Sequence, residues 1–305
     1  MDVPGAEIPR STSSDARPGA RTIAWTLQRE VVLLCAWGPA ILLQLAHPLV
    51  ACGVADHSVF RAERWGRTRR FHRTLEAMLR LSFGTEREAS LGVARINAIH
   101  DRVHGELDEP AGVFPAGTAY SAHDPALLAW VHATLVDMNL RVYERFVGAL
   151  RPEDKDRYCL EASAIERHFG IPEGRLPRSA GELERYMDTM LASGEISVTE
   201  TARTLARAIL YPEAPRLAGP AIGLMRLTTI GLLPPPIRAG YDFPWGARQE
   251  AMLRRWAGLV RALLPLTPSV LRHWPAARAA DRAASGSSCP VTTLARRFHK
   301  PAGLR

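Results

Sequence analysis

The longest uncharged segment of the chain, residues 31–55, limits the choice of fold more than any other feature. Its 25 residues are enough for one helix to cross a bilayer. The segment, however, contains Gly38-Pro39, Gln44 and His47-Pro48, where proline interrupts helical hydrogen bonding and polar groups would be costly in lipid. The sequence therefore predicts broken helices inside a protein core and no transmembrane span, while peripheral contact with a membrane stays open.

Helix-capping signals mark most of the remaining elements. Thr85 and Glu88 form a capping box for a helix that is expected to end at His104, where the next residue is a glycine. Asp124-Pro125 begins a long helix that is expected to run toward Leu150. Further helix boundaries are predicted at Pro152, Gly170, the pairs Ser179/Glu182 and Ser197/Glu200, and the segments 218–232 and 246–264.

Alternation of apolar and polar residues, the pattern of strands, is nearly absent, so the predicted fold class is all-α. A chain of 305 residues with 47% hydrophobic residues can bury one substantial core. We expect a single globular domain of about 8–12 helices over residues 22–276. A disordered leader at 1–21 and a flexible tail at 277–305 would flank this domain.

Charge and cysteine usage argue against several classes of protein. The net charge of +8 comes from arginines spread through helices and tails. The densest basic run, 64–73, matches no helix-turn-helix, zinc-finger or RNP pattern, so no nucleic-acid partner is expected. The four cysteines lack C-x-x-C pairing, which predicts reduced core thiols in a cytoplasmic protein: Cys35, Cys52, Cys159 and Cys289.

A helical projection separates two candidate ligands on the segment that begins at residue 86. An apolar face is formed by four side chains: Val93, Ile96, Ile99 and Val103. His100 falls within this face, whereas His104 lies at its margin near Asn97. The projection therefore predicts that His100 is the more buried of the two histidines.

A third histidine, His132, lies on the helix that begins after Asp124. It falls in the middle of an apolar stripe made of Leu128, Leu135, Val142, Tyr143 and Phe146. Asp137, Arg141 and Glu144 are expected to point elsewhere. A lone histidine on an apolar face is usually a hydrogen-bonded core residue, but several on different helices favour a ligand role.

Two hydrolase classes fit these histidines poorly. His100 and His104 have the i, i+4 spacing of zinc enzymes, but the glutamate of H-E-x-x-H is missing. A serine hydrolase would need a G-x-S-x-G elbow on a parallel sheet, and neither is predicted.

Four blocks of the chain resemble the latex-clearing rubber oxygenase and mycophenolate-pathway oxygenase family. The blocks read GPAILLQLAHPLVACGVADHSVF, RFHRTLEAMLRLSFGT, IHDRVHG and YSAHDPALLAWVHATL, in the family's order and spacing. They lie within about residues 29–146, and weaker similarity continues through the later helices. The resemblance implies an all-helical oxygenase whose cofactor is haem b.

The resemblance also implies roles for residues on the far side of such a cofactor. RFHRT resembles an Arg-x-x-Lys-Thr segment of the rubber-cleaving members, which places Arg70 and Thr74 there. Arg73 stands where the family has lysine, and arginine stays protonated at pH 7, so that lysine's role as an axial ligand does not carry over. The family's acidic residue before this segment has no counterpart, and His47 and His57 occupy the region instead.

The leading hypothesis is therefore a haem-dependent oxygenase. Its His100 imidazole would bind the iron, with O₂ opposite, close to Arg70 and Thr74. His132 and His47 would complete or orient the site, and His104 competes with His100 as the ligand. By resemblance, the substrate is a hydrophobic small molecule, with unsaturated isoprenoids as candidates.

Two alternatives from other classes stay open. One is a non-catalytic helical protein that binds a lipid or a protein partner, with its histidines serving as core residues. The other is a non-haem metal enzyme that uses clustered histidines from facing helices: His47, His57, His100 and His132. The sequence does not determine the oligomeric state.

Overall fold

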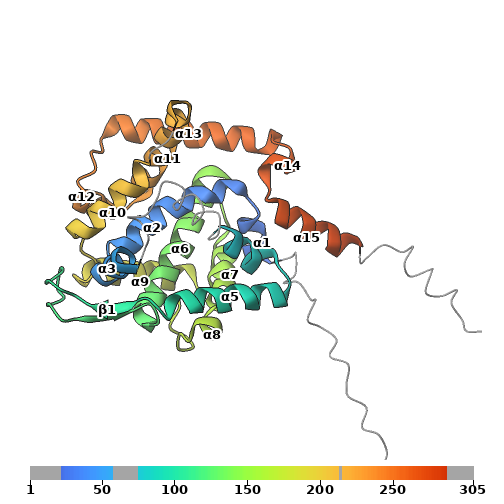
Figure 1. The fold of residues 1–305 in the computed structure, drawn as a ribbon. Coiled ribbons are helices and arrows are strands. Elements are labelled where there is room, and N and C mark those ends of the chain that lie inside the picture. The colour runs from blue at the N-terminus through green and yellow to red at the C-terminus, as the bar shows by residue number, and fades with distance from the viewer. Residues whose placement is uncertain (1–21, 58–74, 213–214, 287–305) are drawn as a thin grey trace, which may run out of the picture.

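Helices dominate the computed structural model, which describes residues 22–57, 75–212 and 215–286 (Figure 1). The helices, with η for 3-10 helix, are α1 (Ile23–Gln28), η1 (Val31–Ala36), α2 (Trp37–Leu45), α3 (Pro48–His57), residues 75–83, α5 (Glu86–His100), α6 (Pro125–Phe146), α7 (Pro152–Ser163), α8 (Glu166–Phe169), α9 (Ala180–Ala192), α10 (Glu200–Leu210), η3 (Arg216–Ala218), α11 (Gly219–Leu232), α12 (Pro235–Gly240), α13 (Ala247–Leu263), η4 (Leu264–Leu266), α14 (Ser269–Arg272) and α15 (Pro275–Gly286). Two short strands, β1 (His104–Glu106) and β2 (Ala119–Ser121), pair antiparallel. The predicted all-α fold is confirmed.

The uncharged segment 31–55 folds as η1, α2 and α3, as its prolines predict. The chain turns by 105° between Val31–Leu45 and Pro48–His57. Leu42, Leu43 and Leu45 of α2 are buried in the main core. Across the part of the chain that the structure describes, no single helix is long and apolar enough to span a membrane, although this bent pair meets the criterion by length and composition.

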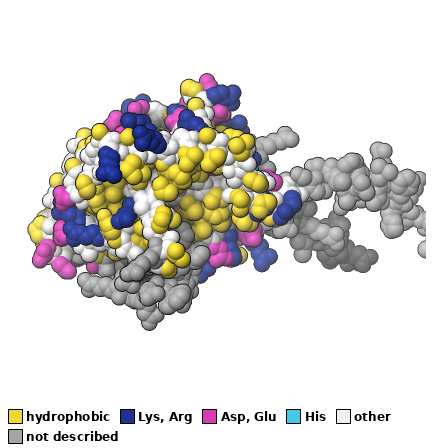
Figure 2. Space-filling model, turned by 90° about the horizontal axis from the view of Figure 1, so that it is seen from above, with side chains coloured by type: hydrophobic (Ala, Val, Ile, Leu, Met, Phe, Trp, Pro, Cys, Tyr) yellow, Lys and Arg dark blue, Asp and Glu magenta, His cyan; other side chains and the backbone are white. Residues whose placement is uncertain are grey.

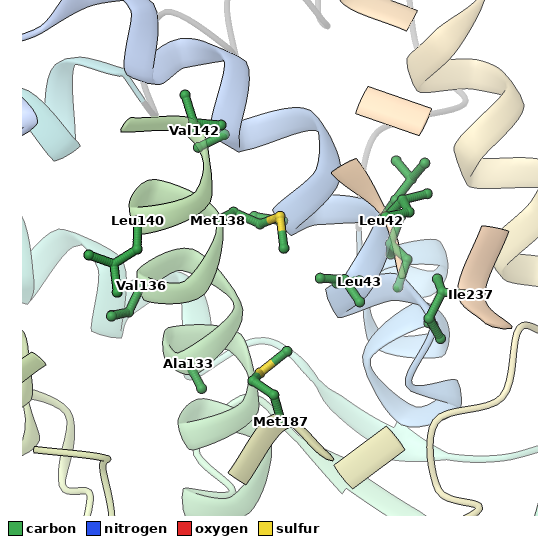
Figure 3. Packing of buried hydrophobic residues seen from close by; sticks show 14 of the residues in the cluster. Leu42, Leu43, Ala133, Val136, Met138, Leu140, Val142, Met187 and Ile237 are labelled. Atoms are coloured by element: carbon green, nitrogen blue, oxygen red, sulfur yellow. The ribbon is translucent and has the colours of Figure 1, made fainter. Parts of the chain in front are cut away.

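Helix α6 runs through the centre of the molecule and contacts η1, α2, α7, α9 and α13 (Figure 1). In Figure 3, Met138 points from α6 toward α2, and Met187 of α9 and Ile237 of α12 complete the same core. Because neighbours surround α6, its buried residues are not confined to one stripe. Asp137, which was expected to point away from the apolar stripe around His132, is also buried, and Arg141 donates to both of its carboxylate oxygens at 2.8 Å.

The capping signals at the starts of α5 and α6 are confirmed. Thr85 Oγ1 accepts from Glu88 N, and Glu88 Oε2 accepts from Thr85 N at 2.8 Å. Asp124 Oδ1 accepts from Ala126 N at 2.7 Å, in the turn that Pro125 opens. These side chains satisfy amide groups that have no partner inside the helix.

The end of α5 differs from its prediction, because the helix stops at His100 and His104 belongs to strand β1. Gly105 pairs with Tyr120 across the two strands. A Cβ atom at Gly105 would lie 2.6 Å from the Tyr120 hydroxyl oxygen. The glycine therefore allows close approach of β2 and does not terminate a helix.

Two other helix boundaries differ from the prediction. The segment that begins at Pro152 divides into α7 and α8, although Gly170 ends it in the left-handed conformation as expected (φ 67°). Thr199, and not Ser197, caps α10, because its side chain accepts from Ala202 N at 3.2 Å. Ser197 N instead donates to the Ala46 carbonyl at 2.8 Å.

Helix α15 continues past residue 276, into the segment that was assigned to a flexible tail. Its Ala277 and Ala280 are buried in a small cluster with Trp25 and Phe83. An alanine-rich segment shows little hydrophobic signal of its own, so its burial depends on these aromatic partners from elsewhere in the chain. The leader at 1–21 and the rest of the tail, 287–305, lie outside the described residues.

Candidate functional site

The predicted site residues fall into three groups in the structure. Arg70 and Thr74 lie outside the described residues, so their positions are not part of the geometry below. His100 lies beside Phe169 of helix α8, and His132 lies near Glu166 of the same helix, whereas His47 and His104 lie elsewhere.

His100 occupies the last turn of α5 and is half-buried. The inward side of this helix is formed by Val93, Ile96, Asn97 and His100, at spacings of three and four residues. Ile99, which was placed on the apolar face, is 56% exposed. The buried side is therefore rotated relative to the projection, toward Asn97.

The surroundings of His100 keep its imidazole neutral. Its ring centroid lies 6.0 Å from that of Phe169 and 5.8 Å from that of His123. Burial lowers the pKa of His100, and the neighbouring His123 lowers it further, while Asp101 acts in the opposite direction. Its Nδ1 is shielded from solvent and has no hydrogen-bond partner among the described residues. A neutral imidazole with an unpaired ring nitrogen is the form that binds a metal.

His132 lies on the central helix α6 with its Nε2 shielded from solvent and unpaired within the described part of the chain. Burial lowers its pKa to about 4, while a hydrogen bond with the Ala162 backbone and the charge of Glu166 act in the opposite direction. Glu166 itself is held in place, because it accepts from Leu176 N at 2.7 Å and from Gly174 N at 3.2 Å.

Helix α8 contributes a neighbour to each of these two histidines. Its Phe169 faces His100, and its Glu166 acts on His132. Asn97 Nδ2 donates to the His168 carbonyl at 3.3 Å, while its Oδ1 is buried without a described partner. We call Asn97, His100, His132 and helix α8 the α8 cluster.

Three of the seven buried side-chain atoms that lack a partner within the described residues belong to the α8 cluster: Asn97 Oδ1, His100 Nδ1 and His132 Nε2. Native proteins pair most buried polar atoms, so unpaired atoms of this kind are typical of a site that receives a ligand or ordered water. The projections indicated His100 and His132 but missed Asn97 and Phe169. Only the i, i+3 spacing of Asn97 and His100 could have indicated Asn97 from the sequence.

His104 is exposed on β1, which confirms the predicted order of burial for the two histidines. Its carbonyl oxygen lies 3.0 Å from His57 Nε2, and the two imidazole centroids are 6.4 Å apart. Tyr120 donates to Asp56 Oδ2 at 2.5 Å beside them. These contacts tie the two-stranded sheet to the end of α3.

His47 is buried at the start of α3, apart from the α8 cluster. Its Nδ1 accepts from Leu49 N at 3.3 Å, and its ring stacks on Phe114 with centroids 5.3 Å apart. Its Nε2 lies 4.0 Å from Glu195 Oε2. Burial lowers the pKa of His47 to about 4, with Asp124 acting in the opposite direction. This histidine stabilises the turn between α2 and α3.

The buried state of His47 predicts acid sensitivity. In the unfolded chain its pKa returns to the ordinary value of 6.5, so the unfolded state binds a proton that the folded state does not. The free energy of unfolding is expected to fall as the pH drops from 6.5 to 4, with about 3 kcal/mol due to this one group. Urea titrations at several pH values measure the slope. His47→Gln should flatten it and His123→Gln should not; equal slopes in His47→Gln and the parent would contradict the assignment.

The described residues contain no group of three or more His, Cys, Asp or Glu side chains that could hold a metal ion. His47, His57, His100 and His132 are not brought together there. A non-haem site needs several protein ligands, whereas haem iron needs only one or two axial ones. Within this part of the chain, the geometry does not support the clustered-histidine alternative.

A shallow groove lies between residues 75–84 and α15. Its lining is mostly apolar and includes Leu75, Leu79, Phe83 and Ala280. The lining contains no histidine or cysteine. We therefore locate the candidate chemistry at the α8 cluster and not at this groove.

Comparison with known proteins gives one match. A family model described as ER-bound oxygenase mpaB/B'/Rubber oxygenase, catalytic domain, matches residues 24–262. No curated protein and no solved structure matches the chain. The match covers most of the described helices, including the whole α8 cluster.

Proposed function

Because the chain belongs to the mpaB/rubber oxygenase catalytic-domain family, we propose that it is a haem-dependent oxygenase whose cofactor is haem b, held by His100. The observation that carries this assignment is the neutral, half-buried imidazole of His100, with a shielded Nδ1 that has no partner in the described structure. Bound haem would supply the binding and activation of O₂.

The donor chemistry of the α8 cluster fits such a cofactor. A histidine that holds haem iron must be neutral and shielded from bulk water, and burial lowers the pKa of His100 in that sense. Phe169 beside it provides an apolar surface against which a flat ring system can pack. The exposed His104 lacks this shielding. His100 is therefore the better candidate for the residue that would hold the haem iron.

The other residues of the cluster have supporting roles in this proposal. His132 Nε2 and Asn97 Oδ1 offer one neutral nitrogen and one acceptor oxygen inside the protein, where they can orient a polar group or a water molecule. Arg70 and Thr74, outside the described residues, keep the distal roles that the resemblance implies. In this proposal His47 orients the α2–α3 turn through Leu49 N.

We further propose that the substrates are O₂ and a hydrophobic small molecule, with unsaturated isoprenoids as candidates, and that the protein works in the cytoplasm. The supporting observation is the family's oxygenase activity together with the apolar surroundings of the cluster. Leu128, Ile165 and Phe169 pack there around Ile171 and Leu176. An apolar environment favours a substrate that leaves water readily.

An absorption spectrum of the full chain, expressed with haem supply, tests the proposal. We expect a Soret band and iron in near-equal molar amount to protein, and O₂ consumption when an unsaturated isoprenoid is added. Protein that lacks both the band and iron under these conditions would contradict the haem assignment and favour the non-catalytic lipid- or partner-binding alternative. Iron without the band would favour a non-haem site.

A further inference from the structure

Acidic residues are scarce in one part of the sequence, so most of the excess positive charge lies there, although arginines are spread along the whole chain. Residues 214–280 contain nine arginines and no lysine, against only two acids, Asp242 and Glu250. This segment therefore carries +7 of the chain's net charge of +8. It includes α11, η4 and α14 together with α13, whose Glu250 is paired with Arg145.

The same segment exposes large apolar side chains. Along α13, η4 and α14 they are Met252, Leu259, Leu263, Leu266, Val270 and Leu271, which we call the α13–α14 surface. Their exposed fractions range from 47% at Met252 to 79% at Leu266. Leu253 and Ala257, on the opposite side of α13, are buried in the core. Helix α13 is thus apolar on two sides, and only one of them is used for packing within the chain.

The exposed apolar side chains gather on one face of the molecule. Figure 2 shows this face from the side where α13 and α14 lie in Figure 1, with hydrophobic side chains across its middle and both basic and acidic side chains around them. Arg254 and Arg255 are exposed on α13 between the apolar positions. No acidic residue occurs between residues 251 and 280.

We propose that the α13–α14 surface docks on an anionic phospholipid bilayer. Leucine side chains at the level of the headgroups would bury their apolar area, and the arginines would pair with lipid phosphates. A second copy of this chain is disfavoured as the occupant, because a symmetric contact would place the exposed Arg254 and Arg255 of both copies against each other. A bilayer supplies both properties of the surface, an apolar layer and a dense negative charge.

Vesicle flotation with the full chain tests the proposal. We expect the protein to float with vesicles of phosphatidylcholine that contain about 30 mol% phosphatidylglycerol, and at least tenfold less with phosphatidylcholine alone. Salt should weaken the binding, because screening reduces the attraction of the arginines to the lipid. Protein that stays with the unbound fraction on both vesicles would overturn the proposal.

Paired variants separate the apolar contribution from general surface effects. Leu266→Ser/Leu271→Ser should reduce binding to the anionic vesicles at least tenfold. The control is Leu91→Ser/Leu160→Ser, which removes two leucines that are 57% and 54% exposed outside the surface. An equal loss of binding in the control, with unchanged circular dichroism, would overturn the location of the docking site.

A second pair tests the charges. Arg254→Gln/Arg255→Gln should reduce binding at least tenfold and make the remainder less sensitive to salt. Arg87→Gln/Arg95→Gln, which removes two exposed arginines of α5, is the matched control and should bind like the parent. A stable dimer in light scattering that Leu266→Ser/Leu271→Ser dissociates would show that a second copy occupies the surface, and would also overturn the proposal.

Discussion

Replacing His100 by alanine is expected to abolish the Soret band of the haem-loaded protein, or to lower its haem content at least tenfold. The imidazole is neutral because burial and His123 lower its pKa, and its Nδ1 is shielded without a described partner. Alanine removes the only group in the α8 cluster that combines these properties with a neighbouring aromatic ring, Phe169. Haem content per protein, measured by absorption and by iron analysis, gives the result.

Two other histidines provide the controls for that experiment. His104→Ala should retain the band, because His104 is exposed and its main contact with His57 is made by the backbone carbonyl. His132→Ala should shift the band without removing it, since His132 is assigned an orienting role. Full haem retention in His100→Ala, together with loss in His104→Ala or His132→Ala, would reassign the ligand and leave family membership intact.

Replacing Arg272 by alanine is expected to lower the free energy of unfolding by about 3–5 kcal/mol, because it leaves a buried carboxylate without its partner. Glu30 is 1% exposed and accepts three hydrogen bonds from Arg272, at 2.8, 2.8 and 3.1 Å. His273 Nε2, 3.4 Å from Glu30 Oε1, compensates only in part. Thermal unfolding should shift downward by roughly 10 °C.

Two further variants distinguish the effect of breaking this buried pair from the effect of removing a surface charge. Arg151→Ala removes an arginine from the exposed pair with Asp154 and should leave the melting temperature unchanged. Glu30→Gln/Arg272→Met removes both charges and should recover part of the stability lost in Arg272→Ala. A melting temperature for Arg272→Ala equal to that of the parent would contradict the importance of the pair.

The features that could be predicted from the sequence are those set by local chemistry. Thr85 and Asp124 cap helices by accepting hydrogen bonds from amides two or three residues away. A few neighbouring residues are therefore enough to predict the cap. The break at His47-Pro48 is also local, because proline removes a backbone donor. The relative burial of His100 and His104 followed from helical spacing alone.

The features that could not be predicted depend on distant partners. The helical projection placed Ile99 on the buried side of α5, whereas the structure places Asn97 there. The cause is helix α8, which covers Asn97 but lies far away in the sequence. His104 was expected in a helix, but its pairing with β2 decides its conformation. Asp137, which was expected to point away from the apolar stripe around His132, is nevertheless buried, and the sequence does not reveal that neighbours surround α6.

The cooperative folding unit of this protein extends beyond the part that defines its family. The family match ends at residue 262, yet Trp25 Nε1 donates to Asp281 Oδ1 at 3.2 Å, and Trp274 N donates to the Arg29 carbonyl at 3.1 Å. Hydrogen bonds therefore connect the beginning and the end of the described chain. Because α1 and α15 depend on each other, we expect their amides to lose protection from hydrogen exchange together. A chain that contains only the matched residues would keep the α8 cluster, but it would expose Trp25 and leave the buried carboxylate of Glu30 without Arg272. Such a chain should be less stable and more prone to aggregation than the full chain.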